Sequence, residues 1–109
     1  MNKQFLLVFF LLTALGVQAQ KEKAVIKTSM VCEMCKDRIE KSLVEMDGIF
    51  SVYADVPTKE VIVKYDTEVL DLDDILVAIT KIGYDADALS ADPVAYDRLH
   101  GCCKKDAVH

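Results

Sequence analysis

The sequence predicts an α+β fold, in which a four-stranded antiparallel sheet carries two helices on one face and a short C-terminal tail follows. Three observations predict it. Apolar residues alternate with polar ones in four short runs and recur at helical spacing in two longer runs. These runs follow the order strand–helix–strand–strand–helix–strand. About 90 residues follow an N-terminal targeting segment, which is enough for one domain with one modest core.

The first strand and the first helix flank a loop that contains two cysteines. Residues 23–28 alternate apolar and polar side chains, a pattern typical of a short strand. After the loop, Ile39, Leu43 and Met46 recur at helical spacing and predict an amphipathic helix. Gly48 is expected to end that helix, because glycine readily adopts the left-handed conformation found at helix C-termini.

The rest of the domain contains a hairpin, a second helix and a last strand. Residues 50–56 and 61–65 each present one apolar face and predict two strands joined by a turn. Asp71 is a suitable N-cap for the second helix, and Gly83 is expected to end it. Residues 84–88 alternate again and predict a fourth strand. The complete order is the split βαβ arrangement of ferredoxin-like domains.

Residues 1–19 have the pattern of a signal peptide. Lys3 provides a short basic start, residues 5–15 are apolar apart from one threonine, and residues 17–19 form a small-residue cleavage site. The apolar stretch is too short to span a membrane, which needs about 20 residues. We therefore expect an exported protein, periplasmic or secreted, whose mature chain starts at Gln20 and keeps no stable membrane anchor.

The composition argues against nucleic acid binding and against catalysis. The net charge is −5, and acidic residues are spread along a chain without a basic run that could follow a phosphate backbone. The sequence has no glycine-rich phosphate loop, no Ser/His/Asp set and no paired carboxylates in a catalytic pattern. We therefore expect a binding protein and not an enzyme.

Cys32 and Cys35 are the strongest functional signal in the sequence. They lie where the predicted first helix begins, and Met30 precedes the first of them by two residues. Thiolates are soft ligands that prefer Cu(I), Zn(II) and similar ions. Unpaired backbone N–H groups at a helix start favour the thiolate, which is the form that binds metal. The motif therefore predicts a soft-metal site.

Residues 20–89 resemble the heavy-metal-associated domain family, which includes copper chaperones, N-terminal modules of metal-pumping P-type ATPases and periplasmic mercury-binding proteins. The matching motifs are Met30-x-Cys32-x-x-Cys35, Ile39-Glu40, Leu43, Gly48-Ile49, Val52, Val61-x-Val63-x-Tyr65-Asp66 and Gly83-Tyr84. Two positions depart from the usual Gly-Met-Thr-Cys loop, since Ser29 replaces the glycine and Val31 the threonine. Ser29 is expected to stiffen the loop, because serine tolerates fewer backbone angles than glycine. Neither change removes a ligand.

The resemblance implies a role for each residue of the site. In this family the two cysteines bind the ion, so Cys32 and Cys35 are the implied ligands, and Met30 supports the loop from beneath without coordinating. The residue at the position of Tyr84 lies close to the metal loop, where it would shield or tune the site; ordinary core packing is the alternative. The implied ion is Cu(I) first, Hg(II) second and Zn(II) third.

The implied function is that of a monomeric carrier, foremost a Cu(I) chaperone, which passes its ion to a membrane transporter or another thiolate protein by ligand exchange. Scavenging of mercury or another heavy metal is an alternative within the same class. A thiol–disulfide oxidoreductase is an alternative from another class, because Cys-x-x-Cys at a helix start is also a redox pattern. The thioredoxin context is missing, since no tryptophan precedes the pair and the strand order differs.

Residues 90–109 form a tail outside the family's domain and carry a second cysteine pair. Pro93 is expected at the first position of a short helix, and His100, Cys102 and Cys103 follow. A disulfide between adjacent cysteines is strained, because their Cα atoms are about 3.8 Å apart, below the usual disulfide range. The pair is therefore expected to bind metal, to bond to the first cysteine pair or to another chain, or to stay free.

Strand and helix lengths allow the tail to return to the metal loop. We hypothesise that Cys102 or Cys103 approaches the Cys32–Cys35 site, where it would cap the ion or form a regulatory disulfide. The alternatives are a second metal site that includes His100, and a tail whose thiols are incidental.

Overall fold

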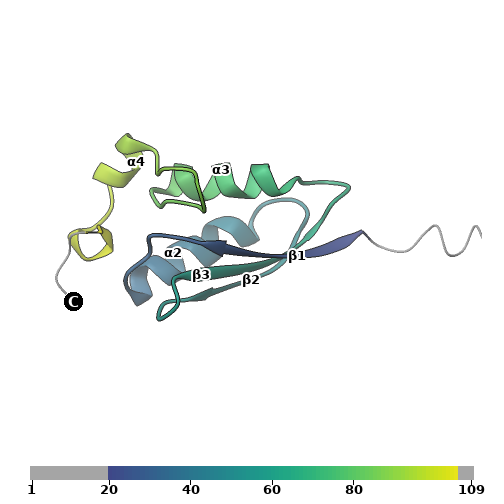
Figure 1. Ribbon diagram of the computed structural model, residues 1–109, viewed down its shortest axis with the longest axis horizontal. Coiled ribbons are helices and arrows are strands. Elements are labelled where there is room, and N and C mark those ends of the chain that lie inside the picture. The colour runs from purple at the N-terminus through teal and green to yellow at the C-terminus, as the bar shows by residue number, and fades with distance from the viewer. Residues whose placement is uncertain (1–19, 106–109) are drawn as a thin grey trace, which may run out of the picture.

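The computed structural model describes residues 20–105, and the sheet within this part of the chain has three strands. They are β1 (Lys21–Lys27), β2 (Ile49–Asp55) and β3 (Glu60–Asp66), with β3 in the middle and antiparallel to both neighbours (Figure 1). The predicted signal peptide, residues 1–19, lies outside the described residues. The strand order leaves β1 at one edge of the sheet, so the loop that follows it is accessible to segments from elsewhere in the chain.

Two longer helices, α2 (Glu33–Val44) and α3 (Leu72–Ile82), follow β1 and β3 respectively and contact each other. The observed order of strands and helices up to Ile82 is the predicted one. None of the helices within residues 20–105 has the length and apolar character needed to cross a membrane.

One face of the sheet is buried together with the apolar stripes of both helices. Ile26, Ala54 and Val63 lie in the same core as the buried residues of α2 and α3. The other face is open, since Val25 and Tyr53 are each 50% exposed. Both helices therefore cover the same face, as predicted for this fold.

The ends of α3 are those predicted from the sequence, whereas α2 ends earlier than predicted. Asp71 is the N-cap of α3, where its N–H donates to Asp74, and Gly83 is the C-cap with φ +122°. α2 ends at Val44, before Gly48, which instead lies in the turn that leads into β2 with φ +91°. Gly48 is still required, because a Cβ there would lie 2.8 Å from the side chain of Val69.

The predicted fourth strand at residues 84–88 is wrong for the described chain. This segment pairs through a single bridge between Ala86 and Thr28, the residue that follows β1. Asp87 then adopts φ +49°, which aspartate tolerates better than most residues, and its carboxylate accepts the N–H of Lys27 at 2.8 Å. A second bridge joins Ala86 to Leu89 and turns the chain back. The Asp87 carboxylate therefore accepts this N–H in place of a backbone carbonyl, and the pairing of the two segments ends here.

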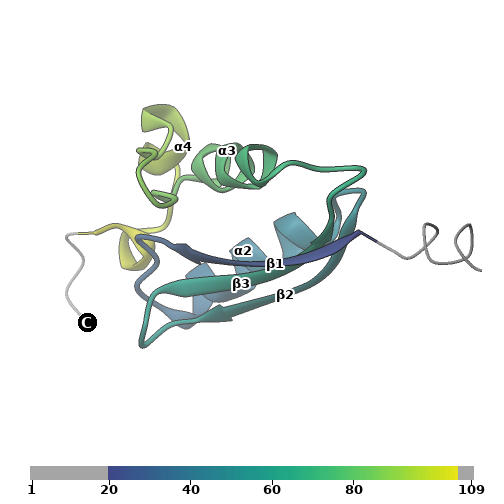
Figure 2. The same ribbon diagram turned by 45° about the vertical axis from the view of Figure 1, so that its right-hand side comes forward.

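The tail folds over the end of the domain where the β1–α2 loop lies (Figures 1 and 2). It contains α4 (Pro93–Asp97) and a short 3₁₀ helix, η1 (Gly101–Cys103). The predicted start of α4 is confirmed, because Asp92 is its N-cap and accepts the N–H of Ala95 at 3.0 Å. Leu99 then enters the core, which attaches the tail to the domain.

Gly83→Ala should lower the free energy of unfolding by about 2 kcal/mol, because alanine is strained at a positive φ. The new Cβ would also lie 3.0 Å from the carbonyl oxygen of Ala95 and 3.1 Å from Leu99. Gly101→Ala is the matched control, since a Cβ there meets nothing within 4 Å. Its stability should change by less than about 0.5 kcal/mol. Urea unfolding measures both variants, and equal losses would contradict the role of Gly83.

Candidate metal centre

The loop between β1 and α2 holds the first cysteine pair at the start of the helix. Cys32 is the N-cap residue of α2, and Cys35 lies in the first turn with its side chain fully buried. Met30 is also fully buried, and its N–H donates to the hydroxyl of Thr28 at 3.3 Å. Met30 thus lies in the core beneath the loop, the place expected of a supporting residue.

All four cysteines of the chain converge at this loop. The sulfur of Cys32 lies 3.1 Å from that of Cys35. From the tail, the sulfurs of Cys103 and Cys102 lie 3.5 Å and 3.9 Å from the same sulfur. The two tail sulfurs are 4.0 Å apart, and all four thiols are free. The structure therefore brings the tail pair to the first pair, as the hypothesis of a returning tail requires.

The four thiols differ in their access to solvent. Cys35 and Cys103 are buried, Cys32 is partly buried and Cys102 is exposed. Met34, within the first motif, is 45% exposed, and its sulfur lies 3.9 Å from that of Cys102. The cluster is thus covered from the core side and open at Cys102.

Tyr84 lies beside the cluster and in the core at the same time. Its side chain is fully buried, and its hydroxyl makes no well-formed hydrogen bond. Burial raises the pKa of this phenol far above its usual range, and the nearby thiols of Cys35 and Cys103 raise it further. The hydroxyl therefore stays protonated, which fits a shielding residue better than an anionic ligand.

The Cys103 thiol is protonated in the metal-free protein at neutral pH. Burial raises the pKa of this thiol, and contacts with the thiols of Cys35 and Cys32 raise it further, against a smaller opposite effect of Tyr84. A metal ion that binds this sulfur must therefore displace its proton.

His100 is not part of the sulfur cluster. Cys32, Cys102 and Cys103 have ligand atoms that all lie within 4.8 Å of one another, and among the described residues the imidazole of His100 does not join them. The side chain of His100 is exposed, and its backbone carbonyl accepts the N–H of Cys103 at 2.8 Å. The predicted second site with His100 as a ligand therefore receives no support from the geometry.

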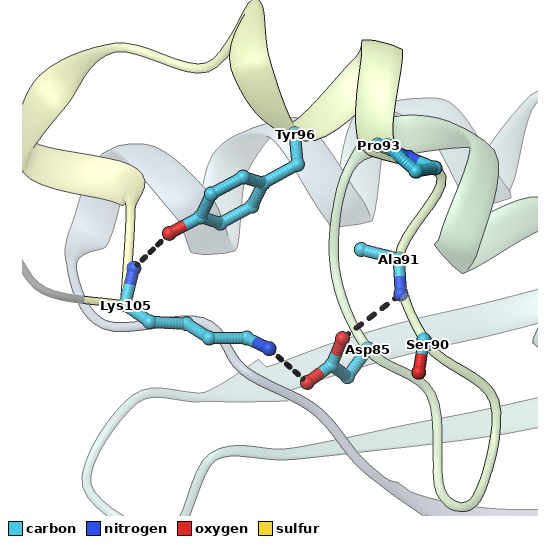
Figure 3. Close-up of a pocket in the computed structure, with 6 residues that line it drawn as sticks. All are labelled: Asp85, Ser90, Ala91, Pro93, Tyr96 and Lys105. Atoms are coloured by element: carbon cyan, nitrogen blue, oxygen red, sulfur yellow. Dashed lines mark hydrogen bonds and ion pairs between the residues drawn. The ribbon is translucent and has the colours of Figure 1, made fainter.

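A set of contacts around Lys105, here called the tail clamp, holds the tail in place (Figure 3). The ammonium of Lys105 lies 2.6 Å from Asp85, and its backbone N–H donates to the hydroxyl of Tyr96 at 3.0 Å. Partial burial opposes ionisation of Asp85, yet hydrogen bonds from Lys105 and from the N–H of Ala91 lower the pKa of its carboxyl overall. The same contact raises the pKa of Lys105. Both groups are therefore charged at neutral pH.

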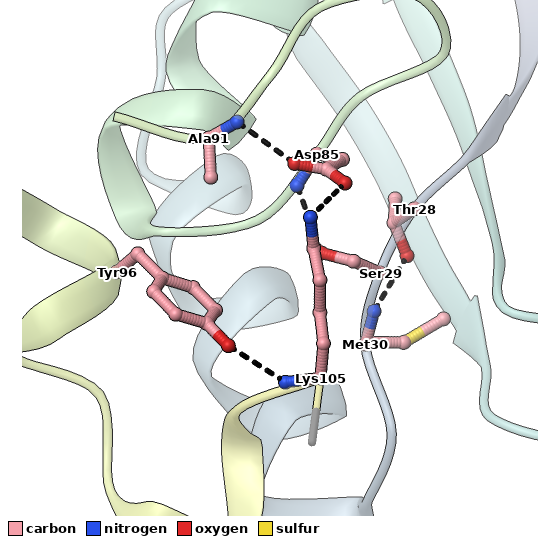
Figure 4. A network of polar contacts seen from close by, with 7 residues as sticks. All are labelled: Thr28, Ser29, Met30, Asp85, Ala91, Tyr96 and Lys105. Atoms are coloured by element: carbon pink, nitrogen blue, oxygen red, sulfur yellow. Dashed lines mark hydrogen bonds and ion pairs between the residues drawn. The ribbon is translucent and has the colours of Figure 1, made fainter. Parts of the chain in front are cut away.

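Ser29 connects the tail clamp to the metal loop (Figure 4). Its hydroxyl accepts the backbone N–H of Asp85 at 2.9 Å. Because this position is a glycine in the usual loop of the family, the serine adds an attachment that a glycine side chain cannot provide. The expected stiffening of the loop thus has a specific partner.

Sequence reasoning missed Asp85 and Lys105 as site residues. The alternating pattern at residues 84–88 presents Asp85 as an ordinary strand residue, and a lysine near the end of a charged tail has no distinguishing spacing. Their opposite charges meet only after the tail has folded back. Ser29 was the one available signal, because it departs from the family's loop.

Comparisons with known proteins match the part of the chain that contains the Cys32–Cys35 motif. The family model of the heavy-metal-associated domain matches residues 24–85. A copper-exporting P-type ATPase of Staphylococcus aureus (strain Newman) is 41% identical over 59 residues, which are 54% of this chain and 7% of that relative. The chain therefore corresponds to only a small part of the ATPase.

Two solved structures match over nearly their whole length. The putative copper-ion-binding protein from Bacillus anthracis str. Ames has a TM-score of 0.61 and 30% identity, over 64% of this chain and 100% of that chain. The CopZ metallochaperone has a TM-score of 0.58 and 27% identity, over 60% of this chain and 98% of that chain. The similarity thus extends over complete small domains and not over one motif.

Alkylation of the reduced, metal-free protein should modify Cys102 first, and Cys35 and Cys103 at least about tenfold more slowly, because buried thiols are protected. Asp85→Asn removes the ion pair of the tail clamp and should speed the labelling of Cys103 more than that of Cys35. Mass spectrometry of peptides after timed exposure to iodoacetamide measures the rates. Labelling of Cys103 as fast as Cys102 in the unchanged protein would contradict a docked tail.

Proposed function

This chain belongs to the heavy-metal-associated domain family, and we propose that it carries one soft metal ion, foremost Cu(I), on Cys32 and Cys35. The observation that carries the proposal is the pair of thiols at the start of α2, with sulfurs 3.1 Å apart. Thiolates favour soft cations over hard ones such as magnesium or calcium.

Copper is the preferred ion because of the proteins that this chain resembles. The ATPase relative is named for copper export, and the matched solved structure at 30% identity is named for copper-ion binding. Hg(II) and Zn(II) remain the competing ions in the proposal. Zinc usually takes four ligands in a closed tetrahedral site, so it would need the tail cysteines as well as Cys32 and Cys35.

Transfer would proceed by ligand exchange with another thiolate protein or a metal-transporting membrane protein. An incoming thiolate adds to the ion, one cysteine of the carrier leaves and takes up a proton, and a second exchange completes the transfer. The match of this domain to a small part of a copper-exporting ATPase supports such a partner. Exchange between two similar sites changes the free energy little. The direction of transfer would therefore depend on how much of the partner is free of the ion.

Cys32→Ser/Cys35→Ser should weaken Cu(I) binding at least about 100-fold, because the two principal soft ligands are lost. Met30→Leu should keep the one-to-one stoichiometry, since leucine replaces the buried methionine at similar volume and only the thioether is lost. Competitive titration of the reduced protein with Cu(I), and in parallel with Hg(II) and Zn(II), measures both variants.

Preference for Hg(II) in that titration would change the function to scavenging of a toxic metal. Failure of all three ions to bind tightly would remove the carrier function. Catalysis of disulfide exchange by the metal-free protein would then favour the oxidoreductase.

We also propose that the carrier acts outside the cytoplasm, as the signal-peptide pattern of residues 1–19 supports. Expression of the whole coding sequence should yield an exported protein whose N-terminus is Gln20. Intact-mass measurement of the exported and the cytoplasmic fractions checks this. An uncleaved chain retained in the cytoplasm would contradict it.

A further inference from the structure

The tail brings a second pair of thiols to the proposed metal site, and the geometry of η1 explains how adjacent residues reach one point. Successive side chains of a 3₁₀ helix are about 120° apart, whereas in an extended strand they point to opposite faces. Cys102 and Cys103 belong to η1. Both sulfurs therefore face Cys32, at 3.9 Å and 3.5 Å.

The three sulfurs of Cys32, Cys102 and Cys103 form a triangle of the size that a metal ion requires. Its sides are 3.9 Å, 3.5 Å and 4.0 Å. A point equidistant from the three sulfurs lies about 2.2 Å from each, close to the zinc–sulfur distance of roughly 2.3 Å, which sets the scale for a soft metal ion. An ion of this size could thus contact all three sulfurs at their present spacing.

We propose that Cys32, Cys102 and Cys103 form a three-thiolate site for Cu(I), in which the C-terminal tail supplies two of the ligands. The inference rests on the proposed function and adds to it the regulation of the same site. Cys32 is shared, because its sulfur is also 3.1 Å from that of Cys35. The ion can therefore pass between the open pair and the tail-covered set by exchanging one metal–sulfur bond at a time.

The tail is held in this position by its own contacts with the domain. Leu99 is 6% exposed and packs in the core, Cys103 is 1% exposed, and Lys105 is fixed by Asp85 and Tyr96. Holding a ligand in place within the same chain raises its effective concentration at the site. Because these contacts order the tail when the chain folds, ion binding does not have to reduce its conformational entropy further. The added thiolates can therefore strengthen binding.

With the tail thiolates bound, release of the ion depends on their displacement by an acceptor. A carrier with two open thiolates lets an acceptor's thiolate enter directly, whereas here a third position is already filled from within the chain. Each tail thiol gives up a proton when it binds the ion and regains one when it leaves. An acceptor must therefore compete with the tail, and undocking of the tail exposes the transferable form.

The first test is the number of sulfur ligands around Cu(I) in the reduced, loaded protein, measured by X-ray absorption. We expect three sulfurs in the unchanged protein and two in Cys102→Ser/Cys103→Ser. Competition with a chromogenic chelator should show Cu(I) affinity about 10- to 100-fold lower in the double variant. His100→Ala is the matched control, because its side chain is exposed in the same segment and outside the cluster.

Cys103 is buried, so the double variant could also disturb the core. A second variant therefore changes only the exposed cysteine of the pair. Cys102→Ser alters an exposed thiol and should still weaken Cu(I) binding by at least threefold, with an unchanged circular dichroism spectrum. Two sulfurs in the unchanged protein, or unaltered affinity in both cysteine variants, would overturn the inference and leave the proposed function standing. Absence of tight Cu(I) binding in the unchanged protein would overturn both.

Discussion

The close packing of the tail against Gly83 is the constraint on which the sulfur cluster depends. A Cβ at this position would lie 3.0 Å from the carbonyl oxygen of Ala95 and 3.1 Å from Leu99, so α4 can rest against the end of α3 only because residue 83 has no side chain. Leu99 enters the core at this contact, and the cysteines of η1 follow directly. The positions of the Cys102 and Cys103 sulfurs therefore depend on Gly83, the C-cap of α3, although α3 itself contains no cysteine.

Electrostatics accounts for the burial of several thiols side by side in this cluster. The pKa values of Cys103 and Tyr84 are both raised, chiefly by burial, so the metal-free cluster keeps these groups neutral. Several adjacent thiolates would be costly in this environment unless a cation compensated them. Exchange of protons for the one soft cation that we propose would supply that compensation, which would link occupation of the site to proton release.

A carrier needs an ion that is held tightly enough to be kept and loosely enough to be handed over. Closed four-cysteine sites retain their metal as a structural element, whereas open sites exchange it. The tail of the proposed carrier would lie between these extremes, because one of its attachments is open to solvent. The Lys105–Asp85 ion pair has side chains that are 54% and 30% exposed, and exposed pairs of this kind contribute about 0.2–1 kcal/mol. Docking strong enough to position ligands can thus remain reversible.

The sequence by itself determined the order of elements, the Asp71 and Gly83 caps, and the Cys32–Cys35 motif at the start of α2, because these depend on local periodicity, capping and spacing. It did not determine where pairing along β1 ends. The alternation at residues 84–88 predicts a strand, but the Asp87 carboxylate replaces a backbone partner. Only the tertiary structure decided that Cys102 and Cys103 meet Cys32 and that Asp85 meets Lys105, because contacts between residues so distant in sequence depend on how the tail packs.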